Sequence, residues 1–352
     1  MQKAIPCVLM RGGSSRGPFL LANDLPREPA RRDQALLALM GSPHALQVDG
    51  IGGAQPQTSK VAIVSRSARP GCDVDYLFAQ VSISEALVDT KPNCGNMLAG
   101  VGPFAIEAGL VEARPGETPV RIFNVNTGAR IDALVQTPGG RVTYEGGAAI
   151  AGVAGTAAPV PLTFRDFIGG KTGKLFPSGA AGEFIDGIPA TLIAAAMPML
   201  LLDGRALGLA GFDDAGAACA DAGFMARLES LRLEAGRRMG FGDVAKSVIP
   251  KTGLLFPSGK GHIAVAYLMP WALHRSLAVT GAVCIAAASA AEGTIARGIA
   301  REISDSINIE HPGGLMTLGI ERGGGSITGA TVLRTARRIF EGRAFVPAHL
   351  YD

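Results

Sequence analysis

Residues 93–109, with the sequence NCGNMLAGVGPFAIEAG, join a short polar start to a segment that is apolar nearly all round. A helix that is apolar on every face has to be buried. The sequence therefore predicts a buried helix over residues 98–108 that ends at Gly109, since glycine commonly terminates a helix.

The segments around this helix alternate between polar and apolar residues with the period of two that is typical of strands. Turn residues, among them Asn126-Thr127-Gly128, separate them. We expect antiparallel strands with a single surface helix over residues 31–40. The predicted strands cover residues 61–65, 74–83, 120–125, 130–135 and 141–144.

The second half repeats this arrangement, with a surface helix over 224–239, a strand over 263–269 and a long buried alanine-rich helix over 281–300. Two nine-residue segments, KTGKLFPSG at 171–179 and KTGLLFPSG at 251–259, differ only at the fourth position. Such a repeat indicates pseudo-symmetric halves. Each copy is either a substrate-facing loop or a purely structural turn, and the sequence leaves both open.

The glycine-rich segment 179–187 is the best candidate linker. It predicts an N-terminal domain over residues 1–182 and a C-terminal domain over residues 183–352, with the last strand as a candidate to return to the first domain. The predicted fold class is thus α+β, with two similar domains that each wrap strands around a central helix.

Composition excludes several classes of protein. The net charge is only +3, aromatic residues are 5% of the chain, and no basic run occurs, so nucleic acid is not an expected partner. The most apolar window, 277–291, is too short to span a membrane. The N-terminus lacks an apolar leader, so we expect a cytoplasmic protein. Five widely spaced cysteines without a CxxC pair predict reduced thiols and no metal site.

Cys94 lies where the buried helix is expected to begin, and free N–H groups there favour a thiolate. The alternative is that Cys94 is a small buried apolar residue. Asn93, Gly95 and Asn96 contribute little to packing but can contact an anion, which favours the functional interpretation. The other four cysteines have no such setting, and we expect them to be structural.

Lys60 opens an apolar strand, where it is either a solvated end or a partly buried base. The segment 11–17, RGGSSRG, offers N–H groups, hydroxyls and guanidinium groups suited to a carboxylate. His311 precedes a tight turn at Pro312-Gly313-Gly314, where it either meets a carboxylate or is satisfied by a neighbour.

Five motifs together resemble the family of 2-methylaconitate isomerases, methylitaconate isomerases and 4-oxalomesaconate tautomerases, which is similar in fold to diaminopimelate epimerase. They are MRGGSSRG at 10–17, DGIGG at 49–53, TSKVAIV at 58–64, NCGN at 93–96 and HPGG at 311–314. The match runs in order over most of the chain. The block from residue 49 through DYLFAQ at 75–80 to residue 109 resembles most the 4-oxalomesaconate tautomerases of gallate breakdown.

The resemblance implies an active site in a cleft between two domains, with Lys60 and Cys94 as the catalytic pair. Relatives commonly have Thr-Ser-Lys-Gly where this chain has Ser14-Ser15-Arg16-Gly17, so the role of Arg16 stays open. Diaminopimelate epimerase has a second catalytic cysteine at the start of its second central helix. Cys284 lies about one turn inside that helix here, which argues against a two-thiol racemase.

The activity implied is a cofactor-independent keto-enol tautomerisation or 1,3-allylic proton shift of 4-oxalomesaconate. Lys60, neutral through burial, would remove the proton and Cys94 would act as acid or relay. Helix starts at residues 95–96 and 280–281 and the loop 11–17 would hold the anion. The expected substrate contacts are Arg11, Ser14, Ser15, Ser59, Asn93, Gly95, Asn96, Thr280, His311, Gly313 and Gly314.

Three alternatives stay open. The substrate could instead be 2-methylaconitate or aconitate, which are also small unsaturated tricarboxylates. The protein could be a metabolite-binding protein without catalysis, or an oligomer built on exposed apolar helices whose thiols and amines react ordinarily. The sequence does not set the oligomeric state, for which a homodimer is one candidate.

Overall fold

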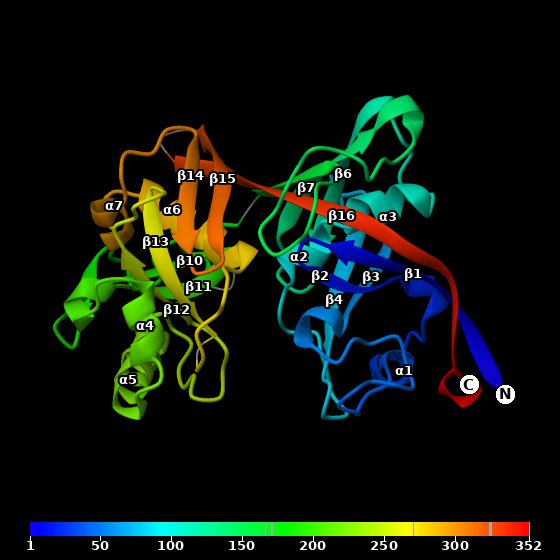
Figure 1. The fold of residues 1–352 in the computed structure, drawn as a ribbon, viewed down its shortest axis with the longest axis horizontal. Helices are drawn as coiled ribbons and strands as arrows, with labels where there is room; N and C mark the ends of the chain where they lie inside the picture. Colours follow the sequence, from blue (N-terminus) through cyan, green and yellow to red (C-terminus); the bar gives the residue numbers. More distant parts are fainter. Residues whose placement is uncertain (166, 170–171, 270, 324–325, 352) are drawn as a thin grey trace. The chain divides into compact units, whose positions relative to one another are not determined.

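The structure, a computed structural model, describes residues 1–352 except 166, 170–171, 270, 324–325 and 352. It forms two compact units (Figure 1). The first contains Met1–Leu162 and Leu333–Asp352, and the second contains Thr163–Val332. No helix among the described residues is long and apolar enough to cross a bilayer.

The first unit is made mainly of strands. In chain order its elements are β1 (Gln2–Gly12), β2 (Ser15–Leu21), η1 (Ala22–Asp24), α1 (Pro29–Met40), η2 (Pro56–Thr58), β3 (Lys60–Arg66), β4 (Val74–Val81), β5 (Val88–Asp89), α2 (Gly95–Leu98), α3 (Val101–Glu107), β6 (Gly116–Asn124), β7 (Arg130–Thr137), η3 (Pro138–Gly140) and the start of β8 (Pro159–Arg165).

The second unit has the same character. It begins within β8 and contains β9 (Glu183–Ile185), β10 (Ile188–Ala195), β11 (Met197–Asp203), η5 (Gly204–Leu207), α4 (Phe212–Ala218), α5 (Ala222–Arg238), β12 (Lys251–Phe256), β13 (Ile263–Leu268), α6 (Val279–Ala290), α7 (Ile295–Ile299), β14 (Ser306–His311), β15 (Gly314–Gly323) and the start of β16 (Ser326–Pro347). The rest of β16 and η6 (Ala348–Leu350) belong to the first unit.

The strand order confirms the α+β class but corrects the expectation of antiparallel strands. In the first unit the order is β1-β2-β3-β4-β6-β7. The β2–β3 and β4–β6 pairs are parallel and the others are antiparallel. Each parallel pair is joined through helices, as parallel strands require, because α1 lies between β2 and β3 in the chain, and α2 and α3 lie between β4 and β6.

Helices cover both faces of the strands in the first unit. On one face, α1 packs Leu36, Leu39 and Met40 into an apolar cluster with strand residues such as Leu20 and Val61. On the other face, α2 contacts β1, β2 and β3, while α3 contacts β3, β6 and β7 (Figure 1). The central helical segment is therefore enclosed by the strands of its own unit, as the sequence predicts.

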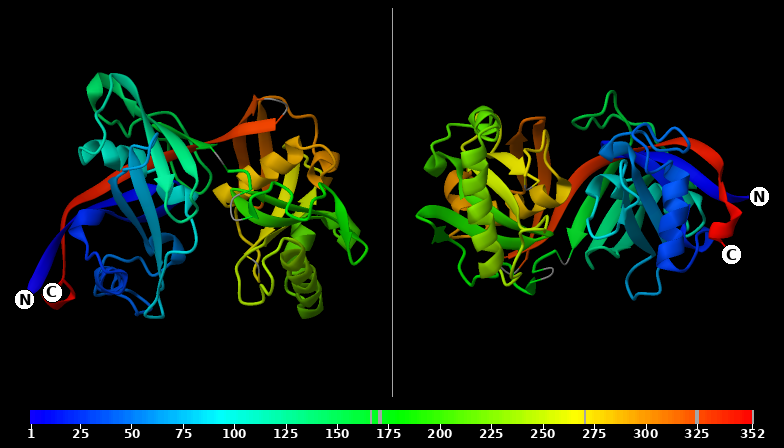
Figure 2. Two further views of the ribbon diagram at one scale, coloured as in Figure 1. Left: turned by 180° about the vertical axis from the view of Figure 1, so that it is seen from behind. Right: turned by 90° about the horizontal axis from the view of Figure 1, so that it is seen from below.

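The second unit is built in the same way. Its strand order is β10-β11-β12-β13-β14-β15, with β11–β12 and β13–β14 parallel and the other pairs antiparallel. α5 packs Leu228 and Leu231 against one face of the strands, and Figure 2 shows this helix in light green. α6 contacts β10, β11, β14 and β15 on the other face. The order of parallel and antiparallel strand pairs is thus identical in both units.

Both buried helices are shorter than predicted. The first is divided into α2 and α3 at Ala99 and Gly100, because Pro103 has no N–H to donate to the Ala99 carbonyl. The second begins at Val279 and ends at Ala290, with α7 following after Gly293, whose φ is +80°. Residues 141–144, predicted as a strand, form none because the chain leaves β7 through the turn η3.

The boundary expected at residue 182 falls inside the second unit. The backbone of Phe167 and Gly169 already bonds to residues 194 and 196, at the end of β10. The proposed linker 179–187 contains β9, which pairs with β10. These residues belong to the second unit because they extend its strands.

The two nine-residue copies adopt different structures. Lys171, the first residue of the first copy, lies outside the described residues, and residues 172–179 form turns and bends. The second copy begins with β12, whose six residues are all buried. Tertiary surroundings thus decide the conformation of this sequence, and the second copy is neither a loop nor a turn over residues 251–256.

Candidate active site

Lys60 is the first residue of β3, and its amine contacts two side chains of β4. Lys60 Nζ donates a hydrogen bond to Gln80 Oε1 at 2.8 Å and lies 5.0 Å from the ring centroid of Phe78. The amide of Gln80 is fixed by hydrogen bonds from its Nε2 to the carbonyls of Pro56 and Ser59. The amine is therefore half-buried and held, rather than a solvated strand end.

Cys94 is the N-cap residue of α2 and is 8% exposed. The hydroxyl of Tyr76, which is fully buried, donates to the Cys94 carbonyl at 3.4 Å. Burial raises the pKa of Tyr76 well above its ordinary value, and the nearby Cys94 thiol adds to the shift. Tyr76 therefore keeps its proton and stays a hydrogen-bond donor beside Cys94.

A single face of β4 connects these two groups. Tyr76, Phe78 and Gln80 are alternate residues of the strand, so their side chains share one face at a spacing of about 7 Å. Tyr76 contacts Cys94, whereas Phe78 and Gln80 contact Lys60. The structure thus brings both sequence-predicted catalytic residues to one side of one strand.

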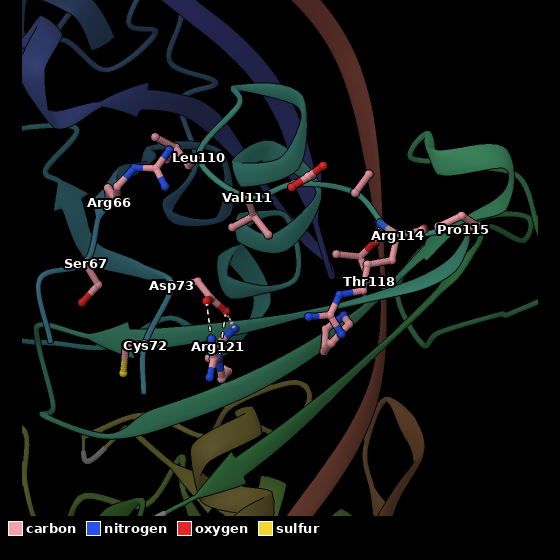
Figure 3. A pocket seen from close by; sticks show the side chains of 13 residues that line it. Arg66, Ser67, Cys72, Asp73, Leu110, Val111, Arg114, Pro115, Thr118 and Arg121 are labelled. Carbon is pink, nitrogen blue, oxygen red and sulfur yellow. Dashed lines mark hydrogen bonds and ion pairs between the residues drawn. The ribbon is translucent and has the colours of Figure 1, made fainter. Parts of the chain in front are cut away.

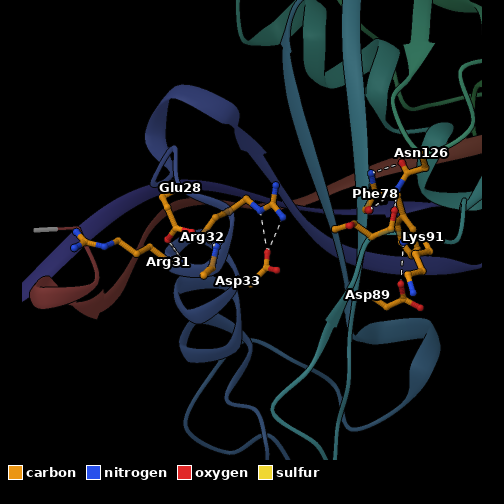
Figure 4. A network of polar contacts seen from close by, with 10 residues as sticks. Glu28, Arg31, Arg32, Asp33, Phe78, Asp89, Lys91 and Asn126 are labelled. Carbon is orange, nitrogen blue, oxygen red and sulfur yellow. Dashed lines mark hydrogen bonds and ion pairs between the residues drawn. The ribbon is translucent and has the colours of Figure 1, made fainter.

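Asn124, the last residue of β6, and Asn126, two residues later, hold the segment that leads into Cys94. Figure 4 shows Asn126 beside Phe78. Asn126 receives a hydrogen bond from the Phe78 N–H and donates to the carbonyls of Phe78 and Thr90, at 2.7–2.8 Å. Asn124 Nδ2 donates to Asn93 Oδ1 at 2.6 Å. The strand that carries the Lys60 contacts is therefore tied to the loop that carries the thiol.

The glycine-rich hairpin between β1 and β2 lies against the start of α2. Asn96 Nδ2 donates to Ser14 Oγ at 3.2 Å. A Cβ on Gly13 would lie 2.2 Å from Asn96 Oδ1, and Gly13 also has a φ of +53°. Glycine is required here for both the close approach and the backbone conformation. The expected contacts Ser14 and Asn96 are therefore neighbours.

The two arginines of this hairpin have different surroundings. Arg11 donates to the carbonyls of Gly13 and Thr335 and to the Thr335 hydroxyl, which fastens the hairpin to β16. A Cβ on Gly53 would come within 2.7 Å of an Arg16 guanidinium nitrogen. Arg16 thus lies against the DGIGG motif, which explains the glycine at position 53.

The remaining expected contacts divide between the two units. Ser59 is fully buried and its hydroxyl donates to Gln47 at 2.6 Å, so it supports the fold around Lys60. Ser15 and Gly95 are buried at the hairpin and at the helix start. Thr280 and His311 lie in the second unit.

Thr280 is the second residue of α6 and is 7% exposed. His311 is the last residue of β14, and its Nδ1 accepts a hydrogen bond from the Gly313 N–H at 3.0 Å. Gly314 follows with a φ of +125°, which glycine adopts readily. The His311 ring thus shapes the turn between β14 and β15.

A cavity of about 700 Å³ in the first unit is not the site of this chemistry (Figure 3). It lies by Arg66, at the opposite end of β3 from Lys60. Asp73 in its wall is neutralised by Arg121, which holds the pKa of that carboxyl below its ordinary value despite burial. None of the candidate residues lines it.

Sequence reasoning missed Tyr76, Phe78, Gln80, Asn124 and Asn126. The alternation of β4 carried part of the signal, because it places three of these residues on one face. Their partners lie up to 48 positions away in the chain, which no local pattern reveals. Among the described residues, no group of three or more His, Cys, Asp or Glu side chains is arranged to hold a metal ion.

Comparison with known proteins identifies the family of the chain. The PrpF protein family matches residues 2–347. The chain is 52% identical over 349 residues to YbhH of Escherichia coli (strain K12), which covers 98% of this chain and 100% of that protein. It is 46% identical over 345 residues to 4-oxalomesaconate tautomerase of Pseudomonas putida, with 97% and 96% covered.

Among solved structures, the crystal structure of methylitaconate-delta-isomerase has a TM-score of 0.90 and 34% identity, and it covers 100% of this chain and 97% of that chain. The similarity therefore extends over the whole fold as well as the sequence. The chain belongs to the PrpF protein family and is an isomerase.

Proposed function

We propose that this isomerase moves a proton within 4-oxalomesaconate, a step in the breakdown of gallate, with Lys60 as the base and Cys94 as the acid or relay. The observation that carries the proposal is the face of β4, where Gln80 and Phe78 hold the amine and Tyr76 holds the thiol segment. The name of the relative from Pseudomonas putida supports the choice of substrate.

The reaction needs only proton transfers. Lys60 Nζ takes a proton from the carbon between the ketone and the double bond, and the electron pair spreads into the ketone and the conjugated carboxylate. A proton then returns from Cys94, either to the ketone oxygen or to the far carbon of the conjugated system. One proton leaves and one returns, so no net oxidation occurs.

Gln80 contributes by fixing the amine. A neutral Lys60 can give one N–H to Gln80 and still offer its lone pair to the substrate. The N–H groups at the start of α2 and the hydroxyl of Ser14 are suited to the dienolate and its carboxylates. Asn93 and Asn96, fixed by Asn124 and Ser14, add polar atoms to the same region.

Deuterium uptake from solvent tests the assignment of the catalytic pair. Lys60→Ala and Cys94→Ala should each slow exchange at the reacting carbon by about 10²–10⁴-fold, the usual contribution of a general acid or base. Lys91→Ala and Cys72→Ala are matched controls outside the β4 face and should exchange at the normal rate. If both catalytic variants exchanged normally, the chain would be a metabolite-binding protein without this chemistry.

The substrate is tested separately. We expect loss of the conjugated absorbance of 4-oxalomesaconate at a kcat/KM well above that for 2-methylaconitate or aconitate. The 34% identity over 395 residues to 2-methyl-aconitate isomerase of Cupriavidus necator makes 2-methylaconitate the second candidate. Turnover of 2-methylaconitate with none of 4-oxalomesaconate would transfer the same mechanism to that substrate.

A further inference from the structure

The repeat of strand order gives Lys60 a counterpart in the second unit. β3 and β12 are each third in their series, parallel to the strand before and antiparallel to the strand after. Each begins with a lysine, Lys60 in β3 and Lys251 in β12. Lys251 also opens the second nine-residue copy, for which the proposed reaction has no role.

The registers make the correspondence specific. In the first unit, Phe19 pairs with Ala62, which is two residues after Lys60. Phe19 itself is four residues after Ser15, the first residue of β2. In the second, Leu201 is four residues after Met197, the first residue of β11, and pairs with Gly253, two residues beyond Lys251.

On the other side of each strand, Ala62 pairs with Phe78 and Gly253 pairs with Tyr267. An aromatic residue thus lies at the same register position beside each lysine. The two lysines are therefore equivalent when counted from either neighbouring strand.

The contacts at the start of the central helix repeat as well. Asn96, two residues after the N-cap Cys94, contacts Ser14 of the β1–β2 turn. Thr280, two residues after the N-cap Ala278, lies with its hydroxyl 4.0 Å from the sulfur of Met197, next to the β10–β11 turn. The second unit thus keeps the lysine but has alanine in place of the reactive thiol.

The surroundings of the two amines differ in one decisive respect. Lys60 pairs across the strands with Gln80, its hydrogen-bond acceptor. β13 ends at Leu268, which pairs with Thr252, so this strand has no residue paired with Lys251 in the place that Gln80 takes opposite Lys60. Lys251 is only 6% exposed, yet among the described residues its amine forms no hydrogen bond or ion pair.

The charged neighbours do not supply a counter-ion. Arg232 of α5 is the charge that acts on Lys251, and it is a second cation. Both carboxylate oxygens of Glu229 already accept hydrogen bonds, from Nε and Nη2 of Arg232. Tyr267 on the adjacent strand keeps its proton, because burial raises its pKa. A nearly buried amine with unused donors beside a cation is arranged for an incoming anion.

We propose that Lys251 is an anion-binding residue that takes a carboxylate group, the class of ligand to which the tricarboxylate proposed above belongs. The inference rests on the proposed function for that ligand class and on the repeat of the fold for the position. Lys251 binds the carboxylate group and is assigned no acid–base step, because the N-cap residue of α6 in its own unit is Ala278 and carries no thiol.

Tricarballylate, a saturated tricarboxylate that cannot isomerise, is the probe. Calorimetry measures its Kd, and fluorescence of Trp271, the only tryptophan of the chain, reports on the location. The indole ring centroid of Trp271 lies 5.7 Å from the guanidinium carbon of Arg232, the residue that acts on Lys251. The unlabelled native protein therefore contains a reporter beside the proposed site.

Four proteins should be compared. Lys251→Met should raise the Kd by about tenfold or more, as loss of a charge-assisted hydrogen bond implies, and should abolish the fluorescence change. Lys251→Arg keeps the charge and should retain binding within about threefold. Lys246→Met removes an exposed lysine of the preceding loop and should bind like the native protein. Circular dichroism confirms that each variant is folded.

Dependence on pH supplies a second readout. Burial, with Arg232 adding to it, lowers the pKa of Lys251 to about 8. Anion binding should therefore weaken in the native protein as the pH rises from 7 to 9, and this loss should be absent in Lys251→Arg. Of the neighbouring groups, Tyr267 keeps its proton because burial raises its pKa, and Arg232 and Glu229 form an ion pair with each other.

The outcomes separate this inference from the proposed function. A native Kd in folded Lys251→Met would overturn the role of Lys251, even if Lys60→Ala had abolished proton exchange. Weakened tricarballylate binding in Lys251→Met would support the role, even if 4-oxalomesaconate were not the substrate. A Kd weakened equally by Lys246→Met would show general charge attraction and would also overturn it.

Discussion

The five thiols of the chain lie in unequal surroundings. Burial raises the pKa of Cys7 to about 11 and that of Cys284 to about 12. The pKa values of Cys72 and Cys219 are raised as well, chiefly by burial. Cys94 differs from the other four in position, because it is the N-cap residue of a helix, α2.

We expect iodoacetamide at pH 7.5 to modify Cys94 first, because a thiolate is the reacting form and burial raises the pKa of each of the other four thiols. Mass spectrometry of peptides from a time course would identify the modified cysteine. Prior addition of tricarballylate should slow the labelling. Faster labelling of Cys72, which is the more exposed residue, would contradict the special status of Cys94.

Lys251 should impose a cost on stability that depends on pH. Its pKa of about 8 in the folded protein lies below the ordinary value of 10.5. Below pH 8 Lys251 is protonated in both the folded and the unfolded protein. The free energy of burying the charged amine then lowers the stability of the folded state in full. Between pH 8 and 10.5 the folded form releases the proton first, and stability from this residue rises with pH.

Lys251→Met should therefore be more stable than the native protein at pH 7, by about 1–3 kcal/mol. The advantage should shrink toward zero as the pH approaches 10.5. Urea unfolding at several pH values measures both quantities, and Lys246→Met is the matched control. An equal stability of the Lys251→Met and native proteins at pH 7 would show that the amine is not desolvated.

Sequence could predict the catalytic pair but not its supports. Lys60 and Cys94 stand within short motifs whose residue types suit their chemistry. Tyr76 and Asn124 are ordinary strand residues by type, and their roles come from partners 18 and 31 positions away. The correspondence of Lys251 with Lys60 could not be predicted from the sequence either, since it depends on the register of strand pairs.

At the scale of elements, the segment before α2 depends on Asn126. Its side-chain amide bridges the backbone of β4 and that of residue 90. It accepts one hydrogen bond from the Phe78 N–H and donates two, to the carbonyls of Phe78 and Thr90. Asparagine suits this task because it has both donors and an acceptor. The sequence shows only the turn Asn126-Thr127-Gly128, which hides the second role of the residue.

Asn126→Ala should lower the free energy of unfolding by about 1–3 kcal/mol, because it leaves buried backbone groups without partners. It should also slow proton exchange by about tenfold or more, since small displacements of catalytic groups are costly. Thermal unfolding and deuterium uptake measure the two effects. The control is Asn308→Ala, which removes a single exposed hydrogen bond to Thr317; an exchange rate as high as in this control would refute the positioning role.

Element positions were predictable where local periodicity decided them. The ranges of α1, β3, β7, α5 and β13 agree with the sequence to within a few residues. The division at Ala99 and Gly100 was missed, although Pro103 gave the signal for it. The strand at 251–256 was not predicted, because the corresponding residues of the first copy, which differ only at Lys174, form no strand from residue 172 onward and tertiary surroundings separate the two.

At the scale of the whole molecule, β16 contributes to both units. Its first residues pair with β15, and its later residues, Ala336 to Pro347, pair with β1. Val346 lies with Ile5 and Cys7 in the apolar cluster beneath α1. The two-unit organisation was predictable from the repeat, whereas the boundary was not, because it lies within strands β8 and β16 instead of in a glycine-rich loop.

Adjacent residues of β16 allow a sharp test. Val346 is 1% exposed and Phe345 is 59% exposed. Val346→Ser should cost about 2–3 kcal/mol of stability, through lost apolar burial and a buried hydroxyl, and should expose Cys7 of the same cluster to alkylation. Phe345→Ser should change either quantity little. Unfolding monitored by circular dichroism and labelling of Cys7 would decide, and equal effects of the two substitutions would contradict the burial of this strand end.

The course of β16 also bears on how the protein is made. A ribosome releases the chain from residue 1 onward, and N-terminal domains generally fold first. Here one of the two strand partners of β1, residues 336–347 of β16, comes after the whole of the second unit in the chain, whereas Thr163–Val332 is continuous. The second unit can therefore fold first, but the first unit must wait until residues 336–347 have emerged. During that interval Ile5 and Cys7 lack their contact with Val346. We therefore expect nascent chains to be most prone to aggregation at the N-terminal strand β1.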